Sequence, residues 1–496
     1  MTEPCDLSAT EARALIGARR LSPVELTQSC IARIEAIDPA INAMVARDFD
    51  GALAAARVIE ADVMAGRPLG PLAGLPLGVK DLIDAKGLPT TFGSTIFKDN
   101  IATADEGAVA RLRAAGAVVI GKTNSPEWGA GGNTRNAVYG ATGNPFDPAK
   151  SAAGSSGGSG AALAAGMVPL ATGSDTGGSC RNPAAFNGVV GFRPTPGLIP
   201  AEKRNMALIP LSTLGPMART VEDACLMLSV MAGEDSRDPL NPVGDFRRRN
   251  TARLARPRPV DLSSLRVAIT PDFGFAPTER IVRAAFDEKI GLMRSAFGQA
   301  ATATPDCTGA DQAFAVLRAV LFLGRHRDLY RDHPDQVGPN VIANIEEGLG
   351  YSAADVADAF ALQTVIYRNW QRFFADHDVI LAPAVTISPR SWRELYPETI
   401  DGVATKSYFH WLALAYAPTL VGHPAVSLPV GLDAAGMPFG LQIIGPRGGD
   451  SLTLGVAHAL ERLLAEDART RRPVPDLARL KAAPPIAQAE GFKSFG

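Results

Sequence analysis

Residues 154–160 read GSSGGSG and residues 167–179 read MVPLATGSDTGGS, and together these two stretches decide the fold. The small residues over 157–166 are compatible with a helix, and the apolar run over 167–172 predicts a short buried strand. Each of these two glycine-rich stretches with serines, called the first and the second serine loop below, therefore adjoins a helix or a strand. Helices and strands that alternate at this spacing are typical of an α/β fold.

The alternation continues on both sides of the serine loops. Ser8 and Ser22 each precede a glutamate three residues later, which predicts capping boxes at the starts of two helices, and Thr220 is a candidate cap for a third. Runs of β-branched residues bounded by glycine or proline mark the strands. Further helices are predicted over 51–65, 106–115, 221–232, 279–297, 311–330, 353–376 and 452–465, and strands ending at Lys80 and over 117–120, 265–269, 379–382, 424–431 and 440–445.

The domain organisation follows from the length and from the absence of a break in composition. A chain of 496 residues allows more than one domain, yet the alternation runs from about residue 65 to the end. We therefore expect a helical N-terminal segment over 1–66, packed on a single α/β domain over 67–475. A helical insertion is expected at about 275–376, and a C-terminal tail over 476–496.

The composition indicates a compact chain without a charged macromolecular partner. Hydrophobic residues make up 46% of the chain and charged residues 20%, which is enough to bury a core. Lys+Arg 49 against Asp+Glu 51 gives a net charge of −2, so no global field attracts nucleic acid or an anionic membrane. The one basic cluster, arginines at 247–249, 253, 256 and 258, is interleaved with prolines and predicts a solvated connecting loop.

Cysteine, histidine and terminal patterns limit the setting and the cofactors. The five cysteines are odd in number and form no C-x-x-C pair, which favours reduced thiols in a cytoplasm. The N-terminus lacks the basic and apolar regions of a secretion signal, and no apolar run approaches the ~18 residues of a membrane span. The six histidines have no metal-ligand spacing, so we expect a cytoplasmic protein with no metal and no cofactor.

A lysine is the candidate base for the two serine loops. Serine is a poor nucleophile unless a base lies within hydrogen-bond reach, and the chain has no histidine before His326. Lys80 ends the apolar run LPLGVK at 75–80, where burial would lower its pKa from ~10.4. Asp81 and Asp84 would oppose that shift if they faced the amine. An ordinary surface lysine is the alternative interpretation.

The glycines around Ser179 predict a site for an oxyanion. Gly177 and Gly178 allow a close backbone approach, so the N–H groups of Thr176, Gly177, Gly178 and Ser179 could point into one concavity. Such donors stabilise the tetrahedral intermediate of acyl transfer. The alternative, a flexible Ser/Gly linker, is disfavoured because apolar secondary structure bounds both runs.

A further stretch matches a nucleotide-binding pattern. Residues 116–123 read GAVVIGKT, which fits the phosphate-binding motif G-x-x-x-x-G-K-[ST]. The variable positions form a β-branched strand, however, and Asn124-Ser125-Pro126 follows where the motif requires a helix. We therefore expect Lys122 to be a structural residue at a strand end, and a P-loop nucleotide-binding protein stays only a remote alternative.

The two serine stretches, taken together, strongly resemble those of the amidase signature family. Further matches occur in the expected order and cover roughly residues 22–465. The resemblance implies a large mixed β-sheet covered by helices on both faces. The matching stretches are GVKD at 78–81, GKTN at 121–124, GSDTGGSCRNPAAF at 173–186, GVVGFRPT at 188–195, GPMART at 215–220 and GLQIIG at 440–445.

Carried over residue by residue, the resemblance implies a serine–serine–lysine mechanism. Ser179 matches the nucleophile, Ser155 the bridging serine in a cis peptide, and Lys80 the terminal base. Ser156 would support their hydrogen bonds, and the backbone carbonyl of Gly129 would lie near the substrate amide. The resemblance also assigns the amides of residues 176–179 to an oxyanion hole.

The activity that the resemblance implies is hydrolysis of carbon–nitrogen bonds in small-molecule amides through an acyl-enzyme, by a monomer or a homodimer. Trp128, Tyr139, Phe146, Phe192 and the stretch 321–330 offer apolar surface, which favours aryl or hydrophobic amides. Esters, anilides and carbamates (urethanes) stay open as substrates because they undergo the same acyl transfer. The glutaminase subunit of a tRNA-dependent amidotransferase, which would need a partner protein, also stays open.

Overall fold

The computed structural model describes residues 3–241 and 251–494, and an eleven-stranded sheet forms its centre. The strand order is β1-β3-β2-β8-β10-β9-β16-β17-β13-β11-β12. β2 is parallel to β3 and β8, β11 is parallel to β12 and β13, and the other pairs are antiparallel. The predicted α/β class and mixed sheet are thus confirmed. The strands are β1 (Met44–Arg47), β2 (Pro76–Lys80), β3 (Val118–Thr123), β8 (Leu170–Asp175), β9 (Val190–Arg193), β10 (Thr213–Ala218), β11 (Arg266–Ile269), β12 (Gln299–Thr302), β13 (Val379–Pro383), β16 (Ala425–Leu432) and β17 (Pro438–Ile444).

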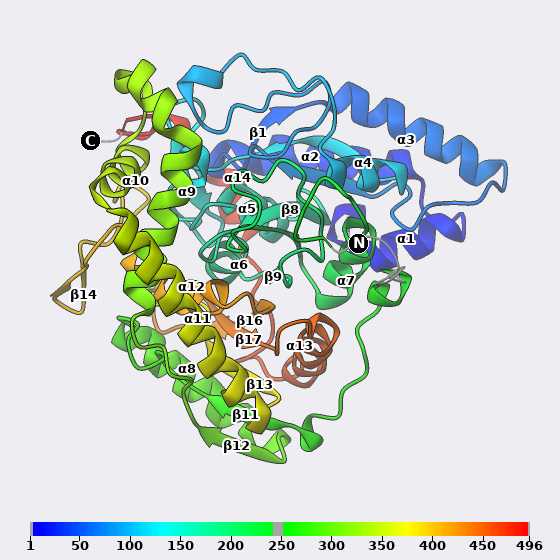
Figure 1. Cartoon of the computed structure of the whole chain (residues 1–496). Helices are drawn as coiled ribbons and strands as arrows, with labels where there is room; N and C mark the ends of the chain where they lie inside the picture. The colour runs from blue at the N-terminus through cyan, green and yellow to red at the C-terminus, as the bar shows by residue number, and fades with distance from the viewer. Residues whose placement is uncertain (1–2, 242–250, 495–496) are drawn as a thin grey trace.

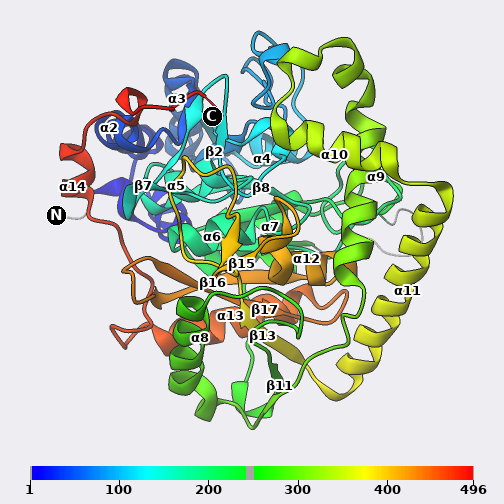
Figure 2. The same ribbon diagram turned by 90° about the vertical axis from the view of Figure 1, so that its left-hand side faces the viewer.

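Helices cover both faces of this sheet, as Figure 1 and Figure 2 show. Successive side chains of a strand point to opposite faces. Along β13, Val379 and Leu381 accordingly belong to one hydrophobic core, and Ile380 and Ala382 to another. The helices are α1 (Ala9–Gly17), α2 (Pro23–Ile41), α3 (Phe49–Met64), α4 (Gly107–Ala114), α5 (Gly157–Ala164), α6 (Arg181–Asn187), α7 (Val221–Met231), α8 (Arg280–Met293), α9 (Ala310–Asp332), α10 (Pro339–Gly350), α11 (Ala353–Asp376), α12 (Ala413–Leu420), α13 (Asp450–Leu464) and α14 (Leu477–Ala482).

The predicted helix caps are present. The side chains of Ser8 and Ser22 each accept a hydrogen bond from the third helical residue, whose glutamate bonds back to the cap and closes a capping box. Thr220 accepts from the backbone N–H of Asp223 at the start of α7. These side chains satisfy backbone donors that the helix itself leaves unpaired. The starts of α1, α2 and α7 therefore agree with the sequence.

Several elements differ from the sequence expectation, and β9, β10, α6, α12 and α14 were not predicted. β8 begins three residues later than predicted, because Pro169 has no N–H for a ladder bond, and it extends to Asp175 by pairing with β10. The segment before residue 67 is not wholly helical, since β1 pairs with β3 at the sheet edge. The insertion contains the strand β12 and also α10, which begins at Pro339, a favoured first helical residue. The domain boundaries themselves stay predictions.

The long helices of the insertion pack beside the second serine loop. α9, α10 and α11, coloured green to yellow, lie together on one side of the molecule in Figure 1 and Figure 2. α9 contacts both of the other two helices, and its Phe314 is buried in the second core. A Cβ added at Gly177, in the second serine loop, would lie 2.9 Å from Phe314 Cζ. α9 therefore packs directly on that loop.

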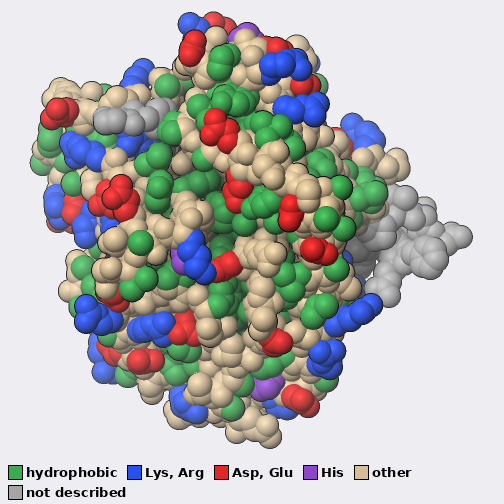
Figure 3. All heavy atoms as spheres, turned by 60° about the vertical axis from the view of Figure 1, so that its left-hand side comes forward, with side chains coloured by type: hydrophobic (Ala, Val, Ile, Leu, Met, Phe, Trp, Pro, Cys, Tyr) green, Lys and Arg blue, Asp and Glu red, His purple; other side chains and the backbone are tan. Residues whose placement is uncertain are grey.

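The surface carries charges of both signs. Figure 3 shows acidic and basic side chains interspersed over one face. Of the predicted basic cluster, residues 247–249 lie outside the described residues, and the chain after them forms a short 3-10 helix at Thr251–Ala255. Among residues 3–241 and 251–494, no helix has the length and apolarity needed to cross a membrane.

Candidate active site

Lys80 lies at the end of β2, inside the protein. Its side chain is fully buried, which rules out the surface lysine that the sequence left open. Its Nζ lies 2.7 Å from Ser155 Oγ, 2.8 Å from Ser156 Oγ and 3.0 Å from Ser174 Oγ. The structure thus joins the predicted lysine to both serines of the first loop. It adds Ser174 on β8, which was not singled out from the sequence although it lies inside the second serine stretch.

Burial lowers the pKa of Lys80, so that part of its amine is neutral and can act as a base at neutral pH. Desolvation lowers the pKa of Lys80 to about 7, with Cys180 and Asp175 opposing the shift. Asp81, the next residue, does not face the amine, because its carboxylate accepts a hydrogen bond from Thr91 and lies 3.9 Å from Lys122 Nζ. The neighbouring acid that could have opposed the shift is therefore directed elsewhere.

The first serine loop is held by close backbone contacts. The Gly154–Ser155 peptide bond is cis. A Cβ added at Gly154 would lie 2.8 Å from the carbonyl oxygen of Gly131, so this position has no room for a side chain. The N–H of Ser156 donates to the carbonyl of Ser179 at 3.2 Å, which ties the two serine loops together. Ser155 is 2% exposed and lines a cavity.

Asp175 fixes the shape of the second serine loop. Its Oδ1 accepts from the N–H of Gly178 at 3.0 Å and from Arg181 Nη2 at 2.8 Å. Burial alone would raise the pKa of Asp175, but Arg181 and Arg193 hold it well below its usual range. The Gly178 N–H therefore already has an acceptor within the loop. In the described part of the chain, the N–H groups of Thr176, Gly177 and Ser179, the other three predicted donors, make no hydrogen bond.

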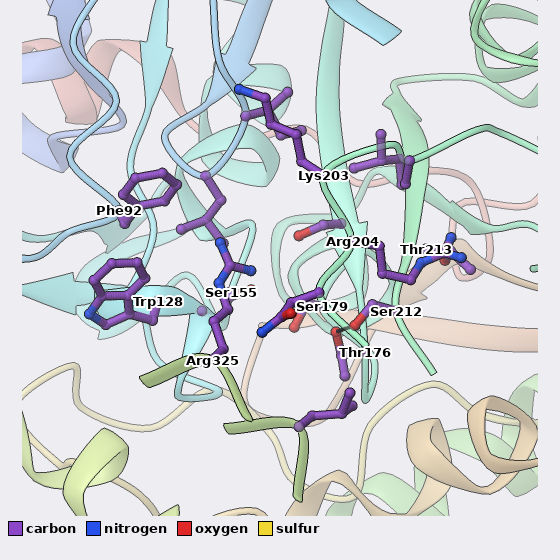
Figure 4. A pocket seen from close by; sticks show the side chains of 18 of the residues that line it. Phe92, Trp128, Ser155, Thr176, Ser179, Lys203, Arg204, Ser212, Thr213 and Arg325 are labelled. Atoms are coloured by element: carbon purple, nitrogen blue, oxygen red, sulfur yellow. Dashed lines mark hydrogen bonds between the residues drawn. The ribbon is translucent and has the colours of Figure 1, made fainter. Parts of the chain in front are cut away.

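Ser155 and Ser179 line the same cavity, of about 280 Å³. Figure 4 shows Phe92 and Trp128 on one side of it and Thr176 and Ser179 on the other. The rings of Phe92 and Trp128 stack with centroids 5.0 Å apart and give that side an apolar surface, and the guanidinium carbon of Arg325 lies 5.9 Å from the ring centroid of Trp128. Among the described residues, Ser179 Oγ has no hydrogen-bond partner, and the side chain lines the cavity. Further lining residues are Leu82, Gly129, Ser174, Leu214, Leu321 and Phe322.

The predicted aromatic residues are only partly brought together. Trp128 lines the cavity, whereas Tyr139 and Phe146 do not, and Phe192 is buried in the core that also contains Val379 and Leu381. From the stretch 321–330, His326 packs on Trp128 with ring centroids 4.5 Å apart. Burial lowers the pKa of His326 to about 3, so it is a neutral wall residue at physiological pH. The position of His326 could have been found from the sequence, because it lies four residues after Phe322 and so on the same face of the predicted helix.

The stretch that matches the phosphate-binding motif is a buried strand. Residues 118–123 form β3, and no helix follows them directly. Lys122 Nζ donates to the carbonyl of Ile83 at 2.6 Å and to Thr90 Oγ1 at 2.9 Å. Its ammonium group is thus used inside the fold, as expected from the sequence, and the strand offers no phosphate loop.

Gly129 is a position where a single methyl group should impair the site. Its φ is +71°, and an added Cβ would lie 3.3 Å from Ser155 Oγ and 3.1 Å from Leu82 Cδ1. We expect Gly129→Ala to lower kcat/KM by about 10- to 100-fold, because small displacements of reacting groups are costly. Gly87→Ala is the matched control, since Gly87 also has a positive φ, of +85°, but open space at Cβ. Equal losses in both variants would contradict a specific role for this contact.

Comparisons with known proteins agree with this architecture. The profile of the Amidase family matches residues 25–454. The chain is 36% identical to an acylamidase of Rhodococcus erythropolis over 458 residues, which cover 92% of this chain and 95% of that protein. It is 34% identical to one subunit of the glutamyl-tRNA(Gln) amidotransferase of Acidothermus cellulolyticus over 508 residues, covering 93% and 96% of the two chains.

A solved structure with this fold is that of a bacterial aryl acylamidase of the amidase signature family. It matches with a TM-score of 0.84 at 28% identity, covering 92% of this chain and 96% of that one. The fold and these likenesses define the protein as a hydrolase of amides. The chain belongs to the amidase signature family.

Proposed function

We propose that this protein hydrolyses aryl or other hydrophobic amides through an acyl-enzyme formed on Ser179. The observation that carries the proposal is the 2.7 Å contact between Lys80 Nζ and Ser155 Oγ, beside the cavity that Ser155 and Ser179 line. A neutral amine there can accept a proton from Ser155, which in turn can accept one from Ser179. Ser156 and Ser174 contact the same amine and would keep it oriented.

The proposed reaction has two halves. In the first, Ser179 Oγ attacks the amide carbonyl as its proton passes to Ser155 and a proton of Ser155 passes to Lys80. The N–H groups of Thr176, Gly177 and Ser179 would stabilise the oxyanion. Ser155 then gives its proton to the leaving nitrogen and regains one from Lys80, the carbon–nitrogen bond breaks, and the amine departs. In the second half, water activated through the same relay releases the acid and frees Ser179.

The apolar side of the cavity supports the substrate class. The stacked rings of Phe92 and Trp128 would bury an aryl or alkyl group of the substrate. The names of two relatives, an acylamidase and an aryl acylamidase, support the same class. Anilides, esters and carbamates share the acyl-transfer step and belong to the proposed range. The oligomeric state, monomer or homodimer, stays a prediction.

A glutaminase subunit is the second candidate function. Its support is the 34% identity to a subunit of a glutamyl-tRNA(Gln) amidotransferase over nearly the whole chain. Glutamine is polar, so the apolar side formed by Phe92 and Trp128 favours the acylamidase function over this candidate. A glutaminase subunit would also act with a partner protein, whereas the proposed amidase acts alone.

Hydrolysis of a substrate panel by the purified chain tests the proposal. The panel contains a nitroanilide, a simple aliphatic amide, glutamine and an aryl carbamate. We expect release of amine from the nitroanilide with a kcat/KM well above that for glutamine. The second candidate function would be favoured if glutamine were the only substrate cleaved. It would also be favoured if glutamine were cleaved only after an amidotransferase partner protein had been added.

The pKa of Lys80 predicts the pH dependence of the reaction. Only the neutral amine accepts a proton, and the pKa of Lys80 lies at about 7. We therefore expect kcat/KM to fall about tenfold per pH unit below pH 7 and to level off above it. A pH profile of kcat/KM on the nitroanilide, with enzyme stability checked at each pH, measures this decrease on the acid side, the acid limb of the profile. An optimum near pH 5 would contradict a lysine base.

A further inference from the structure

Arg318 is a buried guanidinium in the wall of the catalytic cavity. It lies on α9, lines the cavity together with Ser155 and Ser179, and is only 6% exposed. A buried charge is costly unless it is paired. Within residues 3–241 and 251–494, the side chain of Arg318 makes no hydrogen bond and no ion pair, and its Nε is buried without a partner.

Aromatic rings hold Arg318 without satisfying its N–H donors. The guanidinium carbon lies 4.7 Å from the ring centroid of Phe322, 5.0 Å from that of Tyr408 and 5.3 Å from that of Phe409. Such contacts favour a cation and fix its position, but they accept none of its five N–H bonds in the plane of the fork. Burial lowers the pKa of Arg318 to about 9, with Glu347 opposing, so the group stays cationic at neutral pH.

The spacing along α9 places Arg318 near the reacting atoms. Phe314, Arg318, Phe322 and His326 recur at four-residue intervals and share one face of the helix. Phe314 packs on Gly177 of the second serine loop, and His326 packs on the apolar side of the cavity. Four residues advance about 6 Å along a helix axis, so Arg318 lies one turn beyond the contact with the loop.

The other charged groups of the cavity leave a positive excess. Lys203 and Arg204 each form an ion pair with an aspartate. Burial raises the pKa of Glu106 to about 7, which reduces its negative charge at neutral pH. Arg325 reaches from α9 into the cavity (Figure 4), and among the described residues it forms no ion pair. Among the described residues, no carboxylate forms an ion pair with Arg318 or Arg325, so an anionic substrate group could pair with them directly.

We propose that Arg318 binds a carboxylate of the substrate, so that the enzyme acts on amides that carry an acid group beside an aryl or alkyl part. This inference rests on the proposed function, because it places the carboxylate in the cavity of Ser179. The guanidinium fork matches the two oxygens of a carboxylate, and a charge-assisted pair would satisfy the unpaired donors of Arg318. Binding there also orients the amide relative to Ser179.

Binding to the Ser179→Ala protein tests this inference without requiring catalysis. The probes are two neutral–anionic pairs, measured by titration calorimetry. In 4-acetamidobenzoate and 4-acetamidobenzamide the acid or its neutral replacement lies on the amine side, and in N-phenylsuccinamate and N-phenylsuccinamide it lies on the acyl side. We expect the carboxylate of at least one pair to bind at least about tenfold more tightly than its neutral partner.

Variants on α9 locate the preference. In the Ser179→Ala background, Arg318→Met should remove the preference for the carboxylate, and Arg318→Lys should restore part of it. Arg327→Met is the matched control, because Arg327 is an exposed arginine of the same helix. It should retain the full preference. Thermal unfolding of each variant verifies that the protein is folded before binding is measured.

Two results would overturn the inference. One is equal binding of the acid and its neutral partner in both pairs by the protein with Arg318 intact. The other is a preference that survives Arg318→Met and is lost in Arg325→Met, which would place the carboxylate elsewhere. Hydrolysis of neutral anilides without a carboxylate preference would leave the proposed function in place. Conversely, a carboxylate preference in binding without hydrolysis of any amide would reject the proposed function alone.

Discussion

Ser179→Ala should lower kcat/KM for amide hydrolysis by about 10⁴-fold or more, since no covalent intermediate can form without the attacking oxygen. Ser179 lies in the turn after β8, where its Oγ faces the cavity and the N–H groups of Thr176 and Gly177 carry no other hydrogen bond. The side chain is small and partly exposed, so its removal should leave the fold intact. Steady-state kinetics on a nitroanilide measure the loss.

Ser159→Ala is the matched control for this prediction. Ser159 is a buried serine of the first serine stretch, but its hydroxyl donates to the carbonyl of Thr172 at 2.9 Å and lies outside the cavity. Its removal should cost about 1 kcal/mol of stability and leave kcat/KM nearly unchanged. A slow aryl carbamate adds a direct readout, because mass spectrometry should find the acyl group on the unmodified protein and not on Ser179→Ala. Full activity in Ser179→Ala would reject the nucleophile.

The sequence predicted the parts of the site that depend on local backbone chemistry. Glycines around the two serines indicated loops with little room for side chains, and Gly154, where an added Cβ would lie 2.8 Å from the carbonyl oxygen of Gly131, shows why. The run before Lys80 indicated a buried strand, because alternation of polar and apolar residues is absent there. The capping boxes at Ser8 and Ser22 could be predicted for the same reason, since a few neighbouring residues define them.

The parts that could not be predicted depend on contacts between distant segments or on a single backbone group. The engagement of the Gly178 N–H by Asp175 is a matter of side-chain rotamer within a tight turn, which spacing does not specify. Arg318 lies 139 positions after Ser179 and reaches the cavity only because α9 packs on the second serine loop. From sequence alone, an arginine in a mixed polar and apolar helix is indistinguishable from a solvated one. β8 begins later than predicted because Pro169 has no N–H group to donate to the neighbouring strand.

Lys80→Met should lower kcat/KM by about 10³-fold or more and should remove the acid limb of the pH profile, because general-base catalysis and its titrating group are lost together. The amine is buried against Ser155, Ser156 and Ser174, so no solvent base replaces it. Methionine has a similar length and no charge, which keeps the buried site filled.

The pH profile separates the base from a structural role of the same lysine. A variant that is merely misfolded would lose activity at every pH and keep the limb near pH 7, whereas loss of the base leaves a residual rate that no longer follows the pKa of Lys80, which is about 7. Lys86→Met, which changes an exposed lysine six residues further along the chain, should keep both the rate and the limb. A Lys80→Met protein with an unchanged limb would show that another group titrates, and the serine–serine–lysine relay would then be wrong.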